Sequence, residues 1–452
     1  MIGLLLLVIA LVCYFKTRYR WFSYFLYVSF MLGYSGGFGL WTDRVTGIKN
    51  GDLAVVYTLV ISVYLMMTKN YKLPQLSFIK QYKWAVIFLV CSMLFSFIHY
   101  EVSPYYILQG SRGYLLLFAL PILCSIKGNE FDRLMRAIMW ITAFTSVLYI
   151  LQIIVGHPIM PYGDGTVNSY KMDRTTGFVR LYNSPPLKVF FLSLSFVYPQ
   201  YFGKKVNLFR IIFFMSLMCT LGRTGIFAGM LTVFLSVLFC GKTGRLIKMA
   251  FFLGLLFLPF MDMIGNRFEK GGTKDDIQSL LKGNAMYYEN SGDGGTMTYR
   301  IAWVLERSLY LAERPVGEMI FGLGLITDSY PKVYQMYRFR LGIVNRETDE
   351  VYQMSTPDIS YGNLISKWGF GGTIIYLLFV IYMIAYLFRH RKDNPFATVA
   401  AASIAMLLFS SISNSSLSEP NNFVIYYIVI SSLICKGKIL SSTEKNILNR
   451  QQ

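Results

Sequence analysis

Residues 211–240 read IIFFMSLMCTLGRTGIFAGMLTVFLSVLFC, two apolar runs joined by LGRTG. The only charged residue in this stretch is Arg223, and an arginine near the centre of a bilayer costs roughly 2.5–3.5 kcal/mol on insertion scales. The run before Arg223 is too short to span a bilayer alone, because a helical span needs about 20 apolar residues. Gly222 and Gly225 flank the arginine. We therefore expect a broken or re-entrant helix that lines a cavity, where irregular backbone is tolerated.

Apolar runs of this kind recur along nearly the whole chain. Hydrophobic residues make up 54% of the sequence and charged residues 15%, whereas soluble domains carry about 25% charged residues. The prediction is an all-α, polytopic integral membrane helical bundle of about 12–14 spans. It divides into transmembrane helices over 1–263, one large external loop over 264–369, and further transmembrane helices with a cytoplasmic tail over 370–452. The first apolar run lacks a basic leader and a cleavage site, so we read it as a span.

The distribution of charge argues against nucleic-acid binding, despite a net charge of +19. The short segments on one side of the predicted membrane contain 23 Lys and Arg and four Asp and Glu, which accounts for the entire surplus. Lys and Arg concentrate in this way in cytoplasmic loops. The pattern therefore predicts an external N-terminus and a cytoplasmic C-terminus, with no nucleic-acid partner.

The cysteines and histidines predict no metal site, no cofactor and no disulfide framework. All six cysteines lie within or at the edges of predicted spans, and the three histidines are far apart in the sequence. Neither arrangement has the ligand spacing of a zinc site or the pairing expected of a disulfide-stapled domain.

Two external segments are predicted, over residues 157–185 and 264–369. In the second, TYRIAWVLERSLYLAERP places Ile301, Val304, Leu305 and Leu309 at helical spacing. This pattern predicts an amphipathic helix that ends before Pro315 and lies against the outer membrane face.

Four arginines near the outer boundary are candidate ligand-binding residues. Arg112, Arg180, Arg223 and Arg300 have no acidic neighbours in the sequence. Because the guanidinium fork binds phosphate oxygens in pairs, such a group suits a di- or polyanionic ligand. The alternative for Arg112 and Arg300 is that each extends to the membrane interface without binding anything.

Asp358, in STPDISYGN, is the acidic residue best placed for catalysis, since it precedes a predicted span at the outer surface. It is either a general base or an N-cap of the following helix. Tyrosines of the external segments, including Tyr182 and Tyr361, are candidates for stacking on a sugar, with packing as the alternative.

Four motifs, in order, resemble those of the O-antigen polymerase and ligase superfamily. TTGFVRLYNSPPLK is similar to its G-x-F-x-N-P-N element, and TLGRTGIFAGML resembles its S-R-(T/G)-(A/G) signature. GTMTYRIAWVLERSLYLAERPVGEMIFGLG is similar to its R-x-x-x-W…P-x-x-G-x-G stretch, although RIAW is one residue shorter. DISYGNLISKWGFGGTIIY resembles the segment that closes the family's long external loop. The resemblance covers roughly residues 100–390.

The resemblance implies transfer of a glycan from undecaprenyl diphosphate to an acceptor sugar hydroxyl, with inversion and without a metal or nucleotide sugar. The reaction would take place at the periplasmic face of a multi-pass protein of the bacterial inner membrane. It implies substrate-binding roles for two groups of residues: Arg112, Arg180, Arg223 and Arg300 for the diphosphate, and Tyr182, Asn183 and Tyr361 for the glycan. Membrane lipid and a chain-length regulator (a co-polymerase) are the further partners it implies.

One departure from the family bears on the reaction. Ligases of the family carry a histidine at the start of the last motif, and Asp358 occupies that place here. This difference favours a polymerase that joins undecaprenyl-diphosphate-linked repeat units over a ligase that transfers polysaccharide to lipid A core. A polysaccharide flippase or transporter is the alternative from another class, and the long external loop and lack of inverted repeats argue against it.

Overall fold

The apolar runs form helices in the computed structural model, which describes residues 2–32, 50–68, 75–157, 159, 170–172, 179–181, 184–241, 243–257, 296–342, 351–354 and 358–435. Five helical segments are long and apolar enough to cross a membrane: α3 (Asn50–Met67), α4 (Ile79–His99), α5 (Pro104–Leu115) with α6 (Ala119–Leu123), α7 (Gly128–Val155) and α17 (Ser360–Arg389). Shorter helices are α1 (Ile2–Phe15), α2 (Arg20–Leu32), α8 (Lys188–Val197), α9 (Val206–Met218), α10 (Arg223–Phe239), α11 (Thr243–Phe257), α18 (Pro395–Ser410) and the segment Pro420–Cys435. The prediction of an all-α membrane bundle is confirmed.

The outer surface of the bundle is apolar, as expected of helices that face lipid. Large side chains such as Ile98, Phe144, Phe251 and Ile374 are more than half exposed. Inside, hydroxyl groups bond to one another or to helix carbonyls; for example, Tyr27 Oη lies 2.5 Å from Thr58 Oγ1. Such bonds satisfy polar groups that have no access to water in a membrane.

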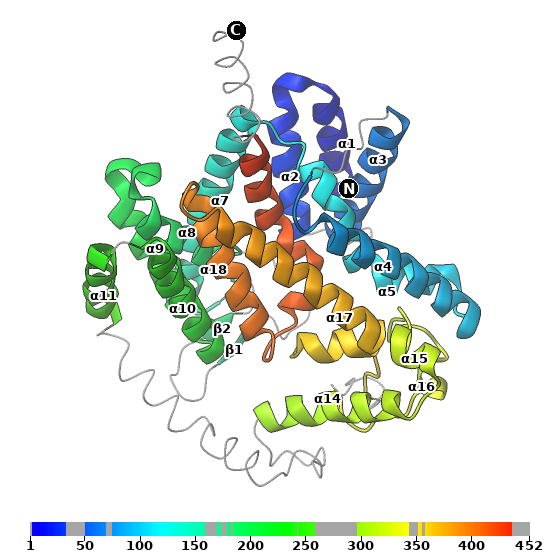
Figure 1. Cartoon of the computed structure of the whole chain (residues 1–452). Coiled ribbons are helices and arrows are strands. Elements are labelled where there is room, and N and C mark those ends of the chain that lie inside the picture. Colours follow the sequence, from blue (N-terminus) through cyan, green and yellow to red (C-terminus); the bar gives the residue numbers. More distant parts are fainter. Residues whose placement is uncertain are drawn as a thin grey trace.

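One end of the molecule, here called the basic end, gathers the described members of the predicted cytoplasmic set. It comprises the α1–α2 link, the start of α7, the 3-10 segment Pro199–Lys205 and the α17–α18 link. Arg18 and Arg133 line one cavity, the Arg136 guanidinium lies 6.0 Å from the centre of the Tyr201 ring, and Tyr201 packs on Phe396. Residues far apart in the sequence therefore share this end, which lies in the upper part of Figure 1.

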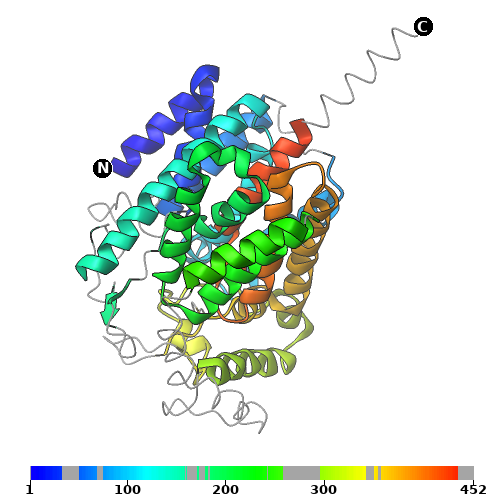
Figure 2. The ribbon, with the colours of Figure 1, turned by 90° about the vertical axis from the view of Figure 1, so that its left-hand side faces the viewer.

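The opposite end, here called the outer end, carries the polar helix α14 (Thr296–Ala312) and the short helices α15 (Val316–Phe321) and α16 (Val333–Met336). In Figures 1 and 2, α14 lies across this end at a steep angle to the bundle helices. A two-stranded hairpin of β1 (Tyr170–Met172) and β2 (Val179–Leu181) lies at the same end, antiparallel with Lys171 opposite Arg180. Helices α8, α10 and α17 begin here.

The break at Arg223 is a tight turn between two helices. Helix α9 ends at Met218, Leu221 adopts a left-handed backbone with φ +52°, and α10 begins at Arg223. The α7 residue Tyr149 donates hydrogen bonds to the carbonyls of Leu181 and Cys219, which fixes this turn beside the hairpin at the outer end. Arg223 is therefore the first residue of α10 and lies at the outer end of the bundle.

Helix α17 bends at Gly369, where φ is +64° and ψ −174°. A Cβ on Gly369 would lie 2.5 Å from the amide nitrogen of Gly322, and a Cβ on Gly322 would lie 2.5 Å from that of Gly369. The adjacent Leu323 amide donates to the Ser366 carbonyl at 2.7 Å. Gly322 and Leu323 of FGLGL thus pack directly on the bend at Gly369. The bend divides α17 into Ser360–Trp368 and the longer part that follows Gly369.

Candidate functional site

Arg300 and Asp358 face each other where α14 meets the start of α17. Arg300 Nη2 lies 3.7 Å from Asp358 Oδ1, and the two side chains are 18% and 41% exposed. Arg300 Nε is shielded from solvent and has no hydrogen-bond partner among the described residues. A buried donor of a guanidinium normally has a partner. The pair therefore presents a cation with unused hydrogen-bonding capacity next to a carboxylate within reach of solvent.

Close helix packing brings Arg300 to this position. The Trp303 ring is fully buried and fills the space beside Gly362 of α17, where a Cβ would overlap it. The face of α14 that packs inward carries Ala302, Trp303, Arg307 and Leu311. The apolar stripe predicted to lie against the membrane is outside this buried face: Leu309 is 54% exposed, and Ile301, Val304 and Leu305 are partly buried. The Trp303 face of α14 is buried because Gly362 of α17 has no side chain and leaves room for the indole ring.

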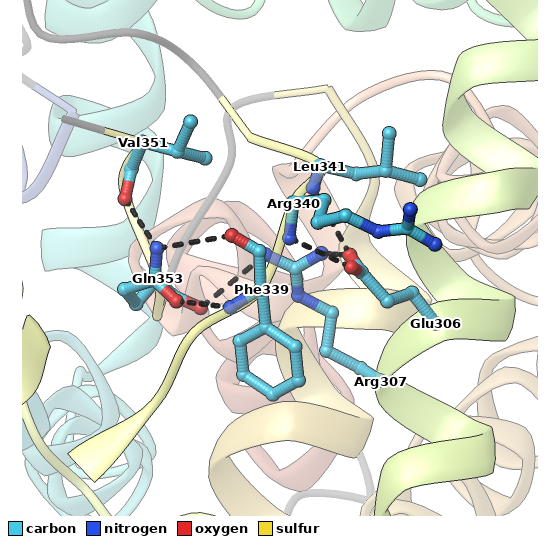
Figure 3. A network of polar contacts seen from close by, with 7 residues as sticks. All are labelled: Glu306, Arg307, Phe339, Arg340, Leu341, Val351 and Gln353. Atoms are coloured by element: carbon cyan, nitrogen blue, oxygen red, sulfur yellow. Dashed lines mark hydrogen bonds and ion pairs between the residues drawn. The ribbon is translucent and has the colours of Figure 1, made fainter. Parts of the chain in front are cut away.

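A polar network fixes the rest of α14 against residues 339–341 and 351–353 (Figure 3). The Glu306 carboxylate accepts the amides of Arg340 and Leu341 at 2.7 and 3.2 Å, and it pairs with Arg307 Nη1 at 2.5 Å. The Gln353 side chain accepts the Phe339 amide and donates to the Val351 carbonyl. These contacts hold residues 339–341 and 351–353 on α14, and so help to fix the position of α14 beside α17.

Arg307 differs from Arg300 in its ring contacts and ion pair, although both lie on α14 and the Nε of each has no hydrogen-bond partner among the described residues. It is fully buried, and its guanidinium lies 4.0 Å from the centre of the Trp303 ring and 4.3 Å from that of Phe339. Burial lowers the pKa of Arg307 to about 10, so it stays charged at neutral pH. Ring stacking and the Glu306 pair indicate a structural role.

Asp358 lies one position before the N-cap residue of α17. The N-cap residue is Ile359, with no side-chain capping bond. The Ser360 hydroxyl instead donates to the Asn414 carbonyl at 2.7 Å and accepts the Leu417 amide at 3.0 Å. The start of α17 is therefore held by the segment that follows α18, and Asp358 lies beside Arg300.

Arg112 has an acidic neighbour in space although it has none in the sequence. Its Nη1 lies 3.1 Å from Asp52 Oδ1 at the start of α3, and both side chains are about one-third exposed. Lys367 of α17 is close enough to Arg112 and Asp328 for their charges to act on its ammonium group. Arg112 thus belongs to a mixed cluster of charges rather than a purely basic one.

The remaining predicted residues are placed less completely. Arg180 lies on β2 and Arg223 starts α10, both at the outer end, but their side chains lie outside what the structure describes. Tyr182 and Asn183 also lie outside the described residues. Tyr361 packs against the main core, and its hydroxyl donates to the Leu408 carbonyl at 2.6 Å.

Two ionisable residues at the outer end were missed by sequence reasoning. Glu419 accepts the Ser415 hydroxyl at 2.7 Å through Oε1, while its Oε2 is shielded and has no partner among the described residues. Burial raises the pKa of Glu419 to about 7. Lys188, the first residue of α8, is only 5% exposed and lies 5.5 Å from the centre of the Tyr149 ring. A signal for Glu419 was available: it is the only charged residue in the polar run SSISNSSLSEPNN, 410–422.

The described part of the chain contains no group of three or more His, Cys, Asp or Glu side chains placed to hold a metal ion. The sequence matches no protein-family model and no curated protein. The chemistry of the outer end must therefore be argued from its own residues.

Proposed function

We propose that this protein is a polysaccharide polymerase of the bacterial inner membrane that joins undecaprenyl-diphosphate-linked repeat units at its periplasmic face. The observation that carries the proposal is the Arg300–Asp358 pair, in which a partly buried guanidinium retains a donor without a partner beside an accessible carboxylate. An arginine of this kind suits phosphate oxygens, and a carboxylate next to it suits the activation of a hydroxyl group.

In the proposed reaction, a base removes the proton of the acceptor sugar hydroxyl as its oxygen attacks the anomeric carbon of the donor glycan. A new C–O bond forms opposite the bond that breaks, so the configuration inverts. The diphosphate leaves with the bonding electrons, and arginines offset its negative charge. Arg300 is the principal candidate for this task, and electrostatic stabilisation of this kind is commonly the largest single contribution to catalysis.

Asp358 is the base in this proposal because it is accessible and adjacent to Arg300. Glu419 is the second candidate, since a pKa of about 7 suits proton transfer near neutral pH. Hydrogen bonds from Ser360 to the 411–417 segment join the start of α17 to the turn that carries Glu419. Replacing Asp358 and Glu419 in separate variants distinguishes which of the two is the base.

The arrangement of helix ends supports an anionic ligand at this end. Helices α8, α10 and α17 all begin at the outer end, and the N-terminus of a helix carries a partial positive charge. Arg223 and Lys188 are the first residues of two of these helices. The potential at the outer end therefore favours a diphosphate, even though the net charge of the external segments is close to zero.

The test is a reconstituted reaction of the purified protein with undecaprenyl-diphosphate-linked oligosaccharide in detergent. The proposal predicts a ladder of longer glycans on a gel, lost in Arg300→Ala and retained in Arg314→Ala, which alters an exposed arginine just after α14. Transfer of a preformed chain to lipid A core without a ladder would replace the polymerase with a ligase. If neither reaction occurs and lipid-linked glycan instead crosses vesicle membranes, the protein is a transporter.

A further inference from the structure

A cavity at the basic end lies between the α1–α2 link and the start of α7. Its volume is about 270 Å³, and it is lined by Thr17, Arg18, Trp21, Lys127, Asn129, Glu130 and Arg133. Three of these side chains are cationic and one is acidic. The cavity is thus far richer in positive charge than an ordinary apolar ligand pocket.

The cations in the cavity are free to meet an anion. Among the ion pairs that the structure describes, none involves Arg18, Lys127 or Arg133. The single carboxylate accepts the Lys127 amide through Glu130 Oε2 at 2.9 Å as part of the helix N-terminus, and it offsets only one of the three positive charges. The lining therefore carries a net positive charge, and an anion in the cavity would reduce the remaining repulsion.

Its surroundings suggest where the anion comes from. Phe15 and Val12 of α1 are half exposed, as are Trp140 and Phe144 of α7, so both helices that flank the cavity present apolar side chains outward. Trp21 lies in the cavity wall, and tryptophan is enriched where hydrocarbon meets headgroups. The cavity therefore opens at the level of the headgroups of lipids whose chains lie against α1 and α7.

We propose that this cavity binds the phosphate of an anionic phospholipid headgroup, in a site that is independent of the proposed reaction at the outer end. The volume supports this choice: it falls below the roughly 300–1,000 Å³ of pockets that enclose drug-sized ligands, so a headgroup fits whereas a nucleotide would not be enclosed. Basic clusters on the cytoplasmic side are the usual partners of anionic lipid headgroups.

The experiment uses native mass spectrometry of the full-length protein, released from nanodiscs of phosphatidylethanolamine with a minor fraction of phosphatidylglycerol. The test variant replaces Arg18, Lys127 and Arg133 by glutamine. A charge-matched control replaces Lys204, Lys205 and Lys392, which are exposed at the same end but do not line the cavity. Thermal unfolding and gel filtration of each variant establish that it is folded.

The site predicts that retention of phosphatidylglycerol falls at least tenfold in the test variant and by less than twofold in the control. Glu130→Gln, which removes the one negative charge, should strengthen retention. Equal small losses in both triple variants would overturn the proposal, because they would indicate general surface attraction. Inorganic phosphate is the competing probe: if it displaces the lipid at millimolar concentration, the source of the anion is a free phosphate and the lipid assignment is wrong.

Discussion

The two ends of this molecule handle charge in opposite ways. The four ion pairs among the described residues all lie at the outer end and join Arg112 to Asp52, Arg300 to Asp358, Arg307 to Glu306, and His99 to Glu318. At the basic end, Arg18, Lys127 and Arg133 share a cavity with no ion pair of that kind. Paired charges hold their side chains in a fixed geometry, whereas unpaired charges of one sign create an electrostatic potential that attracts ions of the opposite sign. We propose that the outer end binds a ligand in a fixed position and that the basic end attracts anions.

The largest expected effect concerns the Arg300–Asp358 pair. Replacing Arg300 by alanine should lower the rate of glycan transfer by about 10²–10³, the usual cost of removing one charge-stabilising donor. Asp358→Asn should cause a comparable loss if Asp358 is the base. Glu313→Gln alters an exposed acid near the end of the same external helix and is the matched control. Initial rates of ladder formation measure the effect. Full activity in Arg300→Ala would contradict the role assigned to Arg300 at the outer end.

The next effect concerns the contact that docks the external segment onto α17. Gly369→Ala and Gly322→Ala introduce a Cβ 2.5 Å from opposing backbone at positions of positive φ. We expect each to lower the free energy of unfolding by about 2–4 kcal/mol. Gly113→Ala is the control, because open space surrounds Gly113 in α5 and alanine favours a helix. Thermal unfolding in detergent measures the difference; equal melting temperatures would show that the docking contact is not rigid.

A smaller effect separates two arginines of one helix. Arg307→Met should lower the free energy of unfolding by about 1–3 kcal/mol, because it removes ring contacts and leaves Glu306 without its cation. Arg300→Gln should change stability by less than about 1 kcal/mol, since Arg300 is partly exposed and its ion pair is long. Denaturation and activity, measured on both variants, should therefore give opposite rankings. The same ranking in both measurements would contradict the division of roles.

The last expected effect is the pH dependence that Glu419 confers. Burial raises its pKa to about 7 from a usual value near 4.5, so the folded state binds an extra proton between these values. Its contribution to stability is fully present below pH ~4.5 and is lost as pH rises through ~7. Glu419→Gln should remove this decline in the melting temperature. An identical pH profile in wild type and variant would show that Glu419 does not titrate in this range.

Much of the fold follows from the sequence because span-length apolar runs and clustered basic loops are direct physical requirements of a membrane. The turn at Arg223 was recognised as a break, but its place at the rim depended on the Tyr149 contacts with Leu181 and Cys219, which local patterns do not encode. The face of α14 that packs on α17 was not predicted. The fit of Trp303 against Gly362 requires knowledge of which helix lies opposite.

The candidate site was predictable in its residue types and less so in its partners. Arg300 and Asp358 were each selected from the sequence, and the structure brings them together across 58 positions of the chain. The acid beside Arg112 was not foreseen, because Asp52 approaches it from a helix 60 residues earlier. Glu419 is the only charged residue of the polar run 410–422, but its raised pKa comes from burial, which the sequence of that run does not show.

The most direct measurement of the central claim is the binding of undecaprenyl diphosphate, the proposed leaving group, to purified wild type, Arg300→Gln and Arg314→Gln. The account predicts that wild type and Arg314→Gln bind with equal affinity, while Arg300→Gln binds at least tenfold more weakly. Equal binding by all three would contradict the assignment of the diphosphate to Arg300 and the outer end.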